Sequence, residues 1–354
     1  MSRDELTSLE RVAMALQYKK PDRVPVAPLV CAASSRVLGI GIDEWSKDAE
    51  LAVKSLLQAQ EIIGMDAFVT LVDLSVEAGD WGQEVVYPRD STAYTNTANP
   101  VIKEVEDYYH LEKINPRETP RMKHVIDMVR GLSAAKGQEV AIVGFVYGPL
   151  GVLSQLRGHE RLFMDCLAHP DAVATAEEVI TQVLVEYAQA QVEAGAHSIC
   201  LDTLYSSGSI MSKALWEKLE GPFAKRVADA IRDTGAILTL HNCGNDIYFD
   251  VQEKWLHPVG ISHAYPADDC QKDWAKHAAK WGKKIVTIGY SVPSNTGLLM
   301  SEDEIMEDCR QQIETFKDCD GGFILATGCE FPPNGSLISA MAMVKAAKTY
   351  GRYV

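Results

Sequence analysis

Short, continuously apolar runs recur along the chain and alternate with longer stretches in which apolar residues return every three or four positions. The short runs predict buried strands, and the longer stretches predict amphipathic helices. Eight strands are expected, at Val24–Leu29, Ala67–Val72, Ala141–Val146, Ser198–Leu201, Ile237–Leu240, Ile261–Ala264, Lys284–Ile288 and Phe323–Thr327. The clearest helices are expected at Glu50–Ile63, Pro170–Ala194, Lys213–Thr234, Lys272–Lys280, Glu302–Lys317 and Leu337–Tyr350.

Apolar strands that alternate with helices are typical of a parallel sheet that is buried on both faces. Eight such units in 354 residues predict an α/β fold, the (β/α)8 TIM barrel. A doubly wound open sheet is the runner-up. That fold normally carries a glycine-rich phosphate loop after an early strand, and neither G-x-G-x-x-G nor G-x-x-x-x-G-K-[ST] occurs in this chain.

One long insertion, Trp81–Glu104, interrupts the pattern after the second expected strand. Its alternating run Gln83–Tyr87 and its prolines Pro88 and Pro100 predict a small inserted hairpin over the barrel mouth. Insertions of this kind serve as lids or partner surfaces, and a plain packing loop is an equally good interpretation. No internal repeat or linker is visible, so residues 1–354 are expected to form a single domain.

Polar side chains gather where the expected strands end, which is where barrel enzymes place their active sites. These positions are Asp73 after the second strand, Tyr147 after the third, Asp202 after the fourth, His241 and Cys243 after the fifth, His263 after the sixth, Tyr290 after the seventh, and Cys329 with Glu330 after the eighth. This concentration predicts an active site at the barrel mouth.

His241, Cys243 and Cys329 are the candidate metal ligands. Residues two apart in a strand point the same way, so His241 and Cys243 can face one ion, and Cys329 at another strand end would be a third ligand. Three protein ligands with nitrogen and sulfur donors and one open position are typical of catalytic zinc. A His-x-Cys alone is a weak signal, because free cysteine is among the most buried residue types.

The remaining thiols and imidazoles compete poorly for this role. Cys31 follows the first expected strand in a loop of small residues, and the other cysteines are expected in packing or surface positions. His197 belongs to the far end of the barrel. The histidines expected on loops and helices are predicted to be solvated, namely His110, His124, His159, His169, His257 and His277.

Two thiolates and one imidazole leave a bound zinc ion close to electrically neutral, and therefore a mild Lewis acid. Such an ion suits the binding of a thiolate, ether or amine heteroatom better than the generation of hydroxide for hydrolysis. This donor set therefore indicates alkyl-transfer chemistry.

Charge and composition exclude several other classes of function. The net charge of −15 argues against a nucleic-acid or anionic-membrane partner. No apolar stretch is long enough to span a bilayer, and the charged start of the chain shows no signal-peptide pattern. Eight scattered cysteines in a chain of this size indicate reduced thiols, so a cytoplasmic protein is expected.

The order of these features resembles the uroporphyrinogen decarboxylase superfamily, and in particular its zinc-dependent corrinoid methyltransferase branch. The resemblance covers nearly the whole chain. It is carried by Glu10-Arg11-Val12 with Pro21-Asp22-Arg23-Val24-Pro25, by His241-Asn242-Cys243-Gly244, by Thr327-Gly328-Cys329-Glu330, and by Tyr350-Gly351-Arg352-Tyr353. The N-terminal signature marks the superfamily, whereas the His-x-Cys with the distant Cys marks the branch.

The resemblance implies that His241, Cys243 and Cys329 bind Zn²⁺. A methyl group would then move between a heteroatom of a small substrate and the cobalamin of a separate corrinoid protein, since the chain lacks an Asp-x-His-x-x-Gly cobalamin motif. Glu330 is expected to be a fourth ligand or a proton donor. The further candidate site residues are Asp202 and Asp73, which would orient substrate or serve structure, together with Tyr290 and His263.

Three alternatives stay open at this stage. The Thr-Gly-Cys-Glu ending resembles that of the demethylating members of the branch, which implies demethylation of a methoxylated aromatic or a similar donor. The first alternative is transfer from methylcobalamin to a thiol such as coenzyme M. A metal-free decarboxylase-like lyase is disfavoured, because the segment 30–36 holds one arginine, Arg36, where decarboxylases of the superfamily carry an arginine-rich motif. The third is a non-catalytic barrel with a closed zinc site. A homodimer is possible in each case.

Overall fold

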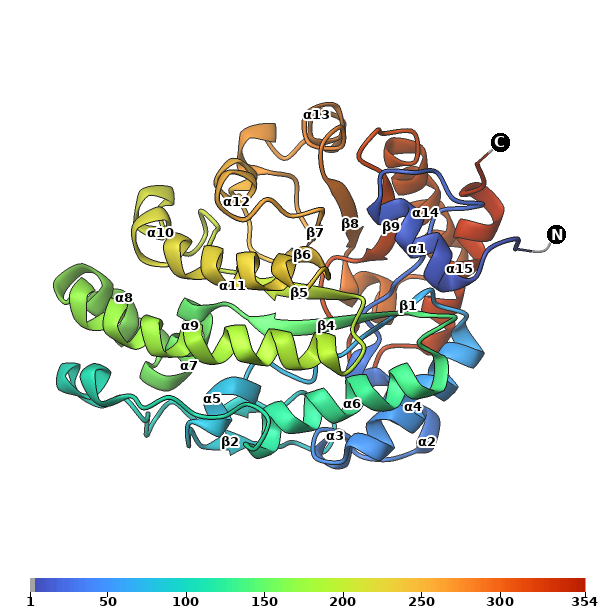
Figure 1. Ribbon diagram of the computed structural model, residues 1–354. Coiled ribbons are helices and arrows are strands. Elements are labelled where there is room, and N and C mark those ends of the chain that lie inside the picture. The colour runs from blue at the N-terminus through green and yellow to red at the C-terminus, as the bar shows by residue number, and fades with distance from the viewer. Residues whose placement is uncertain (1–3, 354) are drawn as a thin grey trace.

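Seven strands form one parallel sheet in the computed structural model, which describes residues 4–353. Each strand pairs in parallel with the next one around the sheet. The strands are β1 Ala67–Val69, β4 Ala141–Tyr147, β5 Ser198–Asp202, β6 Ile237–Asn242, β7 Gly260–His263, β8 Val286–Ser291 and β9 Phe323–Thr327. The predicted barrel-like α/β fold is confirmed, and seven of the eight expected strands are present (Figure 1).

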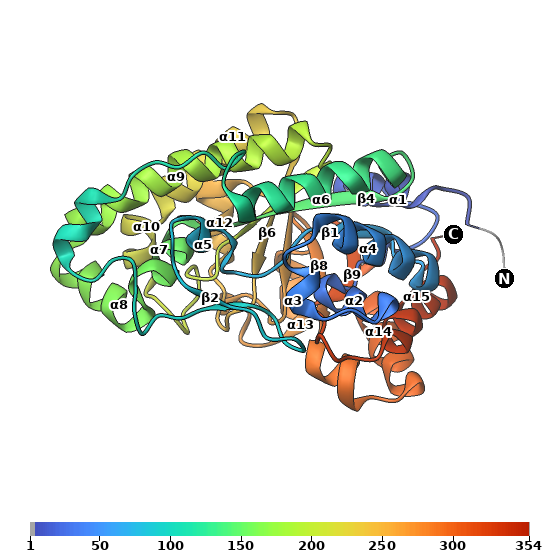
Figure 2. The same ribbon diagram turned by 90° about the horizontal axis from the view of Figure 1, so that it is seen from below.

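Helices cover the outside of this sheet. The α-helices are α1 Ser8–Leu16, α2 Ser35–Leu38, α3 Ile42–Trp45, α4 Ala49–Ile63, α5 Val76–Asp80, α6 Pro120–Lys136, α7 Pro149–Arg157, α8 His159–Ala168, α9 Pro170–Glu193, α10 Lys213–Leu219, α11 Gly221–Asp233, α12 Phe249–Leu256, α13 Trp274–Lys280, α14 Glu302–Phe316 and α15 Leu337–Tyr350. Short helical turns lie at Cys31–Ser34, Val105–His110, Asp268–Cys270 and Asn295–Leu299. Helices α6, α9 and α11 pack side by side along the strands (Figure 2). No helix among residues 4–353 is long and apolar enough to cross a membrane.

The expected helix Lys213–Thr234 is wrong as one element, because it is divided into α10 and α11 at Glu220. Pro222 follows Gly221 at the start of α11 and has no N–H to donate, so a continuous helix would lose a hydrogen bond there. The break also buries Glu220, whose carboxylate accepts hydrogen bonds from Trp216 Nε1 (2.7 Å) and Leu150 N (3.3 Å).

The expected first strand, Val24–Leu29, is wrong as a regular strand, although it lies in the eighth position of the barrel. It pairs with β9 through one parallel bridge between Val26 and Leu325. Pro25 and Pro28 supply no N–H groups, which interrupts the ladder of hydrogen bonds that a regular strand needs. We call Val24–Leu29 the closing segment, because it fills the gap between β9 and β1.

A buried carboxylate attaches the closing segment to β1. Asp66, which directly precedes β1, accepts a hydrogen bond from Val26 N (2.8 Å) and forms ion pairs with Arg11 Nη1 and Arg23 Nη1, both at 2.8 Å. Asp66, Arg11 and Arg23 are all almost fully buried. Asp22 completes the group by accepting from Arg11 Nε at 2.7 Å. The N-terminal signature of the sequence therefore closes the barrel.

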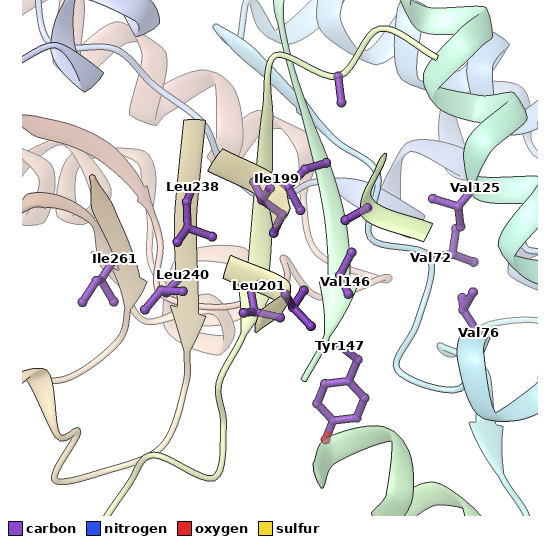
Figure 3. Close-up of a cluster of buried hydrophobic side chains, with 14 of the residues drawn as sticks. Val72, Val76, Val125, Val146, Tyr147, Ile199, Leu201, Leu238, Leu240 and Ile261 are labelled. Carbon is purple, nitrogen blue, oxygen red and sulfur yellow. The ribbon is translucent and has the colours of Figure 1, made fainter. Parts of the chain in front are cut away.

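Alternation along the strands separates two layers of side chains. Outward-facing residues pack beneath the helices, and Figure 3 shows part of this layer, with Ile199, Leu201, Leu238 and Leu240 on neighbouring strands. Inward-facing residues fill the barrel and leave only a cavity of about 60 Å³ between them. The lower barrel is therefore filled, and the larger space of about 480 Å³ lies above the strand ends.

The segment Trp81–Glu104 contains a two-stranded antiparallel sheet of β2 Val85–Val86 and β3 Tyr94–Thr95. Gln83 fastens its base, because its side-chain amide donates to Asn96 O (2.7 Å) and accepts from Val101 N (3.0 Å). The segment lies at the C-terminal ends of the strands, whereas the two termini meet at the other end of the barrel through a bridge between Arg23 and Arg352.

We expect the substitution Asp66→Ala to lower the free energy of unfolding by about 3–5 kcal/mol, because it removes the fully buried carboxylate that pairs with both Arg11 and Arg23. Urea unfolding followed by circular dichroism measures this loss. Glu61→Ala is the control, since it removes an exposed carboxylate paired with Lys136 and should change stability by no more than about 0.5 kcal/mol. Equal effects of the two substitutions would contradict the role given to Asp66.

Candidate active site

A cavity of about 480 Å³ lies above the C-terminal ends of the strands. We call it the mouth cavity. Its walls come from the strand ends, from the insertion with β2 and β3, from the end of α7 and from the start of α8. The lining residues are Leu71, Asp73, Leu74, Ser75, Thr92, Ala93, Tyr94, Thr95, Thr97, Gln155, His159, Asp202, His241, Cys243, Cys329 and Glu330.

His241 reaches the mouth cavity from β6, where it is paired with Asp202 of β5 on one side and Ser262 of β7 on the other. Its Nδ1 lies 3.0 Å from Ser262 Oγ. This hydrogen bond fixes the imidazole ring and leaves Nε2 to face the cavity. Histidine ligands of metal ions are commonly oriented by such a contact through their other nitrogen.

Cys243 follows β6 and keeps the inward direction of His241 two residues earlier. The chain turns immediately afterwards at Gly244, which lies so close to the loop after β5 that a Cβ there would sit 2.3 Å from Ser207 Oγ. Asn242 holds the same turn, since its side chain accepts from Gly244 N at 2.9 Å and donates to Thr203 O at 2.7 Å. The sequence His-Asn-Cys-Gly thus fixes the direction of both ligands.

Cys329 comes from the loop after β9 and is preceded by Gly328. A Cβ at Gly328 would lie 2.6 Å from Ala264 Cα, so only glycine lets this loop approach β7 closely. The closing segment holds the loop from the other side, because Leu29 N donates to Thr327 Oγ1 (3.2 Å) and Phe331 N donates to Leu29 O (2.9 Å). Barrel closure therefore determines where Cys329 lies.

The structure brings together the three residues predicted as metal ligands, with their donor atoms all within 4.8 Å of one another. The hydrogen bond from the Cys243 thiol holds the pKa of Cys329 well below its usual range. Burial acts in the opposite direction, and His241 lowers the pKa of Cys329 further. The Cys329 sulfur and burial raise the pKa of Cys243. Burial acts to lower the pKa of His241, but Cys329 and Asp202 outweigh it and the pKa is raised. The three groups thus share protons that a metal ion would displace.

This donor set fits zinc. Two sulfurs and one imidazole nitrogen are the ligands that Zn²⁺ prefers, and their separation suits a single ion. The three donors line the mouth cavity, so a fourth coordination position would face the space where a substrate enters.

Two carboxyl groups adjoin the three donors in the mouth cavity. Asp202, at the end of β5, accepts from Leu204 N at 2.9 Å, and burial raises its pKa to about 6. Burial likewise raises the pKa of Glu330 to about 8, and its Oε1 is buried without a hydrogen-bond partner. Both residues lie where the sequence predicted them, and Glu330 is placed to accept or deliver a proton.

Asp73 lines the mouth cavity but is engaged in a structural pair. Its two carboxylate oxygens accept from Arg121 at 3.2 and 2.6 Å, and it also accepts from Ser75 N at 2.8 Å. Arg121 in turn lies over the ring of Tyr87, 5.2 Å from its centroid. Of the two roles considered for Asp73, these contacts support the structural one.

The structure does not bring His263 or Tyr290 into the site. His263 lies outside the barrel, because it follows inward-facing Ser262 by one residue, and its ring packs against Phe249 and Trp274. Tyr290 stacks on Trp274 with ring centroids 3.5 Å apart. Ile288 faces the inside of the barrel, so regular alternation of side chains would also turn Tyr290 inward. The alternation is interrupted at Gly289, whose φ of 154° lies in a region that favours glycine. The prediction that these two residues belong to the active site is therefore wrong.

Several residues that line the mouth cavity or orient a ligand were missed by sequence reasoning. Ser262 could have been found only from the register of β6 against β7, and Thr92, Thr95 and Thr97 only from where the insertion folds. His159 was expected to be solvated, but it lines the mouth cavity and its Nδ1 lies 2.9 Å from Tyr205 Oη. The same expectation is wrong for His124 and His277, which are buried.

Comparison with known proteins agrees with this geometry. The model of the family described as uroporphyrinogen decarboxylase (URO-D) matches residues 7–350. A methylcobamide:CoM methyltransferase, MtbA of Methanosarcina mazei, is 25% identical over 246 residues, covering 68% of this chain and 71% of the relative. A uroporphyrinogen decarboxylase of Wolbachia sp. subsp. Brugia malayi is 25% identical over 309 residues, covering 85% of this chain and 82% of that protein. A solved methyltransferase structure from Methanosarcina mazei has a TM-score of 0.83 at 22% identity and covers 98% of this chain and 99% of its own, so it shares the fold.

We expect the protein to bind one equivalent of zinc and the substitution Ser262→Ala to weaken binding by about 10–100-fold, because His241 loses the contact that orients its ring. Competition with a chelator measures the affinity. Ser294→Ala, at an exposed position after β8, is the matched control and should leave the affinity unchanged. Zinc far below one equivalent, or equal affinities for both variants, would contradict the proposed ligand set.

Proposed function

Because the chain belongs to the uroporphyrinogen decarboxylase family, we propose that it is a zinc-dependent methyltransferase that works with a corrinoid protein. It would move a methyl group between a heteroatom of a small substrate and the cobalamin of that partner. The observation that supports this proposal most directly is the meeting of His241, Cys243 and Cys329 at the mouth cavity, with donor atoms within 4.8 Å of one another. Two thiolates make an ion that binds heteroatoms without strongly activating water.

Bound zinc would stabilise the negative charge that a sulfur, oxygen or nitrogen atom carries when it loses or awaits a methyl group. The protein's own groups would orient the metal ligands and exchange a proton with the substrate. Ser262 orients His241, Gly244 and Gly328 keep the two thiols in place, and Glu330 lies beside Cys329 with an unpartnered oxygen that can exchange a proton with the substrate heteroatom.

The cobalamin partner would dock over the mouth cavity, because the methyl group must pass directly between the two reacting atoms. The insertion forms one wall of this cavity through Thr92, Thr95 and Thr97, so it is the segment that a docking protein would meet there. A cytoplasmic location and a homodimer stay predictions.

For the direction of transfer we favour demethylation of a methoxylated aromatic or a similar methyl donor. Glu330 supports this direction, since a carboxylic acid beside the leaving heteroatom can return the proton that the released alcohol or phenol needs. Transfer from methylcobalamin to a thiol is the second candidate, and the name of the Methanosarcina mazei relative favours it.

Decarboxylation of a porphyrinogen is disfavoured by the mouth cavity. Arg36, the one arginine of the segment where decarboxylases carry their arginine-rich motif, donates to Gly335 O and is absent from the cavity lining within residues 4–353. The carboxylates of a porphyrinogen would therefore meet no guanidinium group there.

Incubation of the zinc-loaded protein with cob(I)alamin and a panel of methoxylated aromatics tests the proposal. We expect the absorption of methylcobalamin to appear with at least one donor, and Cys329→Ser to lower the rate at least about 100-fold while the protein stays folded. Glu61→Ala is the control for a substitution far from the site. Formation of methylcobalamin by metal-free protein, or undiminished activity of Cys329→Ser, would contradict zinc-dependent transfer.

A further inference from the structure

The mouth cavity carries an unbalanced set of charges. Asp73, Asp202 and Glu330 line it, and none of the lining residues in the described part of the chain is lysine or arginine. With two thiolates and one imidazole around it, a zinc ion would add almost no net charge. A substrate that enters this cavity therefore meets carboxyl groups and no fixed positive charge.

Arg121, a cation that contacts this lining through Asp73, is already engaged. Arg121 pairs with Asp73 through both carboxylate oxygens and lies over the Tyr87 ring, and its side chain is 11% exposed. This pair neutralises Asp73, and within residues 4–353 no lysine or arginine is paired with Asp202 or Glu330. His159 does not supply a positive charge in its place, since burial lowers the pKa of its imidazole.

Glu330 also offers an unused hydrogen-bond acceptor. Its Oε1 is buried and has no hydrogen-bond partner. A buried acceptor without a donor is costly, so a ligand that donates a hydrogen bond or carries a positive charge would be favoured there. Neither protonation state of a carboxyl group supplies the positive charge that would hold a sulfonate or a carboxylate.

We propose that the substrate of this site is uncharged or cationic at the end away from its reacting heteroatom, and that Asp202 and Glu330 select against anionic substrates. The inference rests on the proposed methyl transfer and narrows its substrate class. It separates this chain from a coenzyme M enzyme, because coenzyme M is a thiol that ends in a permanently charged sulfonate.

Three small thiols test the proposal, since they share the HS–CH2–CH2 group and differ only in their terminal charge. They are 2-aminoethanethiol, 2-mercaptoethanol and 2-mercaptoethanesulfonate. Cobalt(II) replaces zinc, and the change in thiolate-to-cobalt charge-transfer absorption when a thiol is added reports its binding. Each affinity is calculated from the concentration of the ionised form of the added thiol. We expect the sulfonate to bind at least about tenfold more weakly than the other two. Equal or tighter binding of the sulfonate would overturn the proposal.

Two variants identify the groups that discriminate. Measured above pH 8, where both carboxyl groups are ionised, Glu330→Gln and Asp202→Asn should each bring the affinity of the sulfonate closer to that of 2-mercaptoethanol. Glu50→Gln, at an exposed position on α4, changes the net charge equally and should leave the ratio of affinities unchanged. A ratio that none of the cavity variants alters would contradict the roles of Asp202 and Glu330.

A metal-free measurement separates this inference from the proposed function. Methanethiosulfonate reagents transfer a charged thioalkyl group to a cysteine thiolate, forming a disulfide and releasing methanesulfinate. Each rate is divided by the rate of the same reagent with a small free thiol in solution. After this correction, Cys243 and Cys329 of the metal-free protein should react at least about tenfold faster with the trimethylammonium reagent than with the sulfonate reagent. Cys319, which lies outside the mouth cavity, is the internal reference. Burial, Asp320 and Asp318 raise its pKa while Lys20 and Lys283 act against them, so its preference between the two reagents should be weaker than that of Cys243 and Cys329.

The cobalt-binding and labelling experiments distinguish a failure of the proposed function from a failure of the proposed substrate class. Absence of cobalt binding with a retained labelling preference would count against methyl transfer alone. Cobalt and thiol binding without any charge preference in either experiment would overturn the substrate class and leave the proposed function standing.

Discussion

Asp66 holds the barrel closed by binding two guanidinium groups and one backbone N–H inside the wall between β9 and β1. The closing segment cannot form a full ladder of hydrogen bonds, because two of its six residues are prolines. Its attachment to β1 combines one backbone hydrogen bond, from Asp66 N to Val26 O (2.8 Å), with the contacts of the Asp66 carboxylate to Arg11, Arg23 and Val26 N. From this segment, Leu29 contacts both Thr327 and Phe331 around the loop that carries Cys329. The N-terminal signature thus positions a metal ligand more than 300 residues away along the chain.

Much of the fold could be predicted from the sequence, because continuous apolar runs report burial on both faces of a parallel sheet. The ligand set could be predicted as well, since His241 and Cys243 are two residues apart in one strand and Cys329 follows another. The predictions that were wrong or missing depended on contacts between residues that are far apart in the sequence. Tyr290 stacks on a helix outside the barrel, His263 is one residue out of phase with Ser262, and Ser262 itself becomes visible only through the register of two strands.

The mouth cavity combines two features that narrow its chemistry together. Soft donors at the strand ends suit the binding of a heteroatom, and carboxyl groups around them suit a substrate without negative charge. The barrel fold is shared with the solved methyltransferase, whereas many side chains of the mouth cavity belong to loops, which vary most readily while the scaffold stays constant. Relatives named as decarboxylases and as methyltransferases are compatible with one scaffold for this reason.

X-ray absorption at the zinc edge of the metal-loaded protein tests the central claim most directly, because it counts the atoms bound to the ion. The structure predicts two sulfur neighbours at about 2.3 Å and one nitrogen at about 2.0–2.1 Å, with a further light atom in the open position that a thiol would replace with a third sulfur. A shell of oxygen and nitrogen alone, or four sulfurs before any thiol is added, would contradict the His241, Cys243 and Cys329 site.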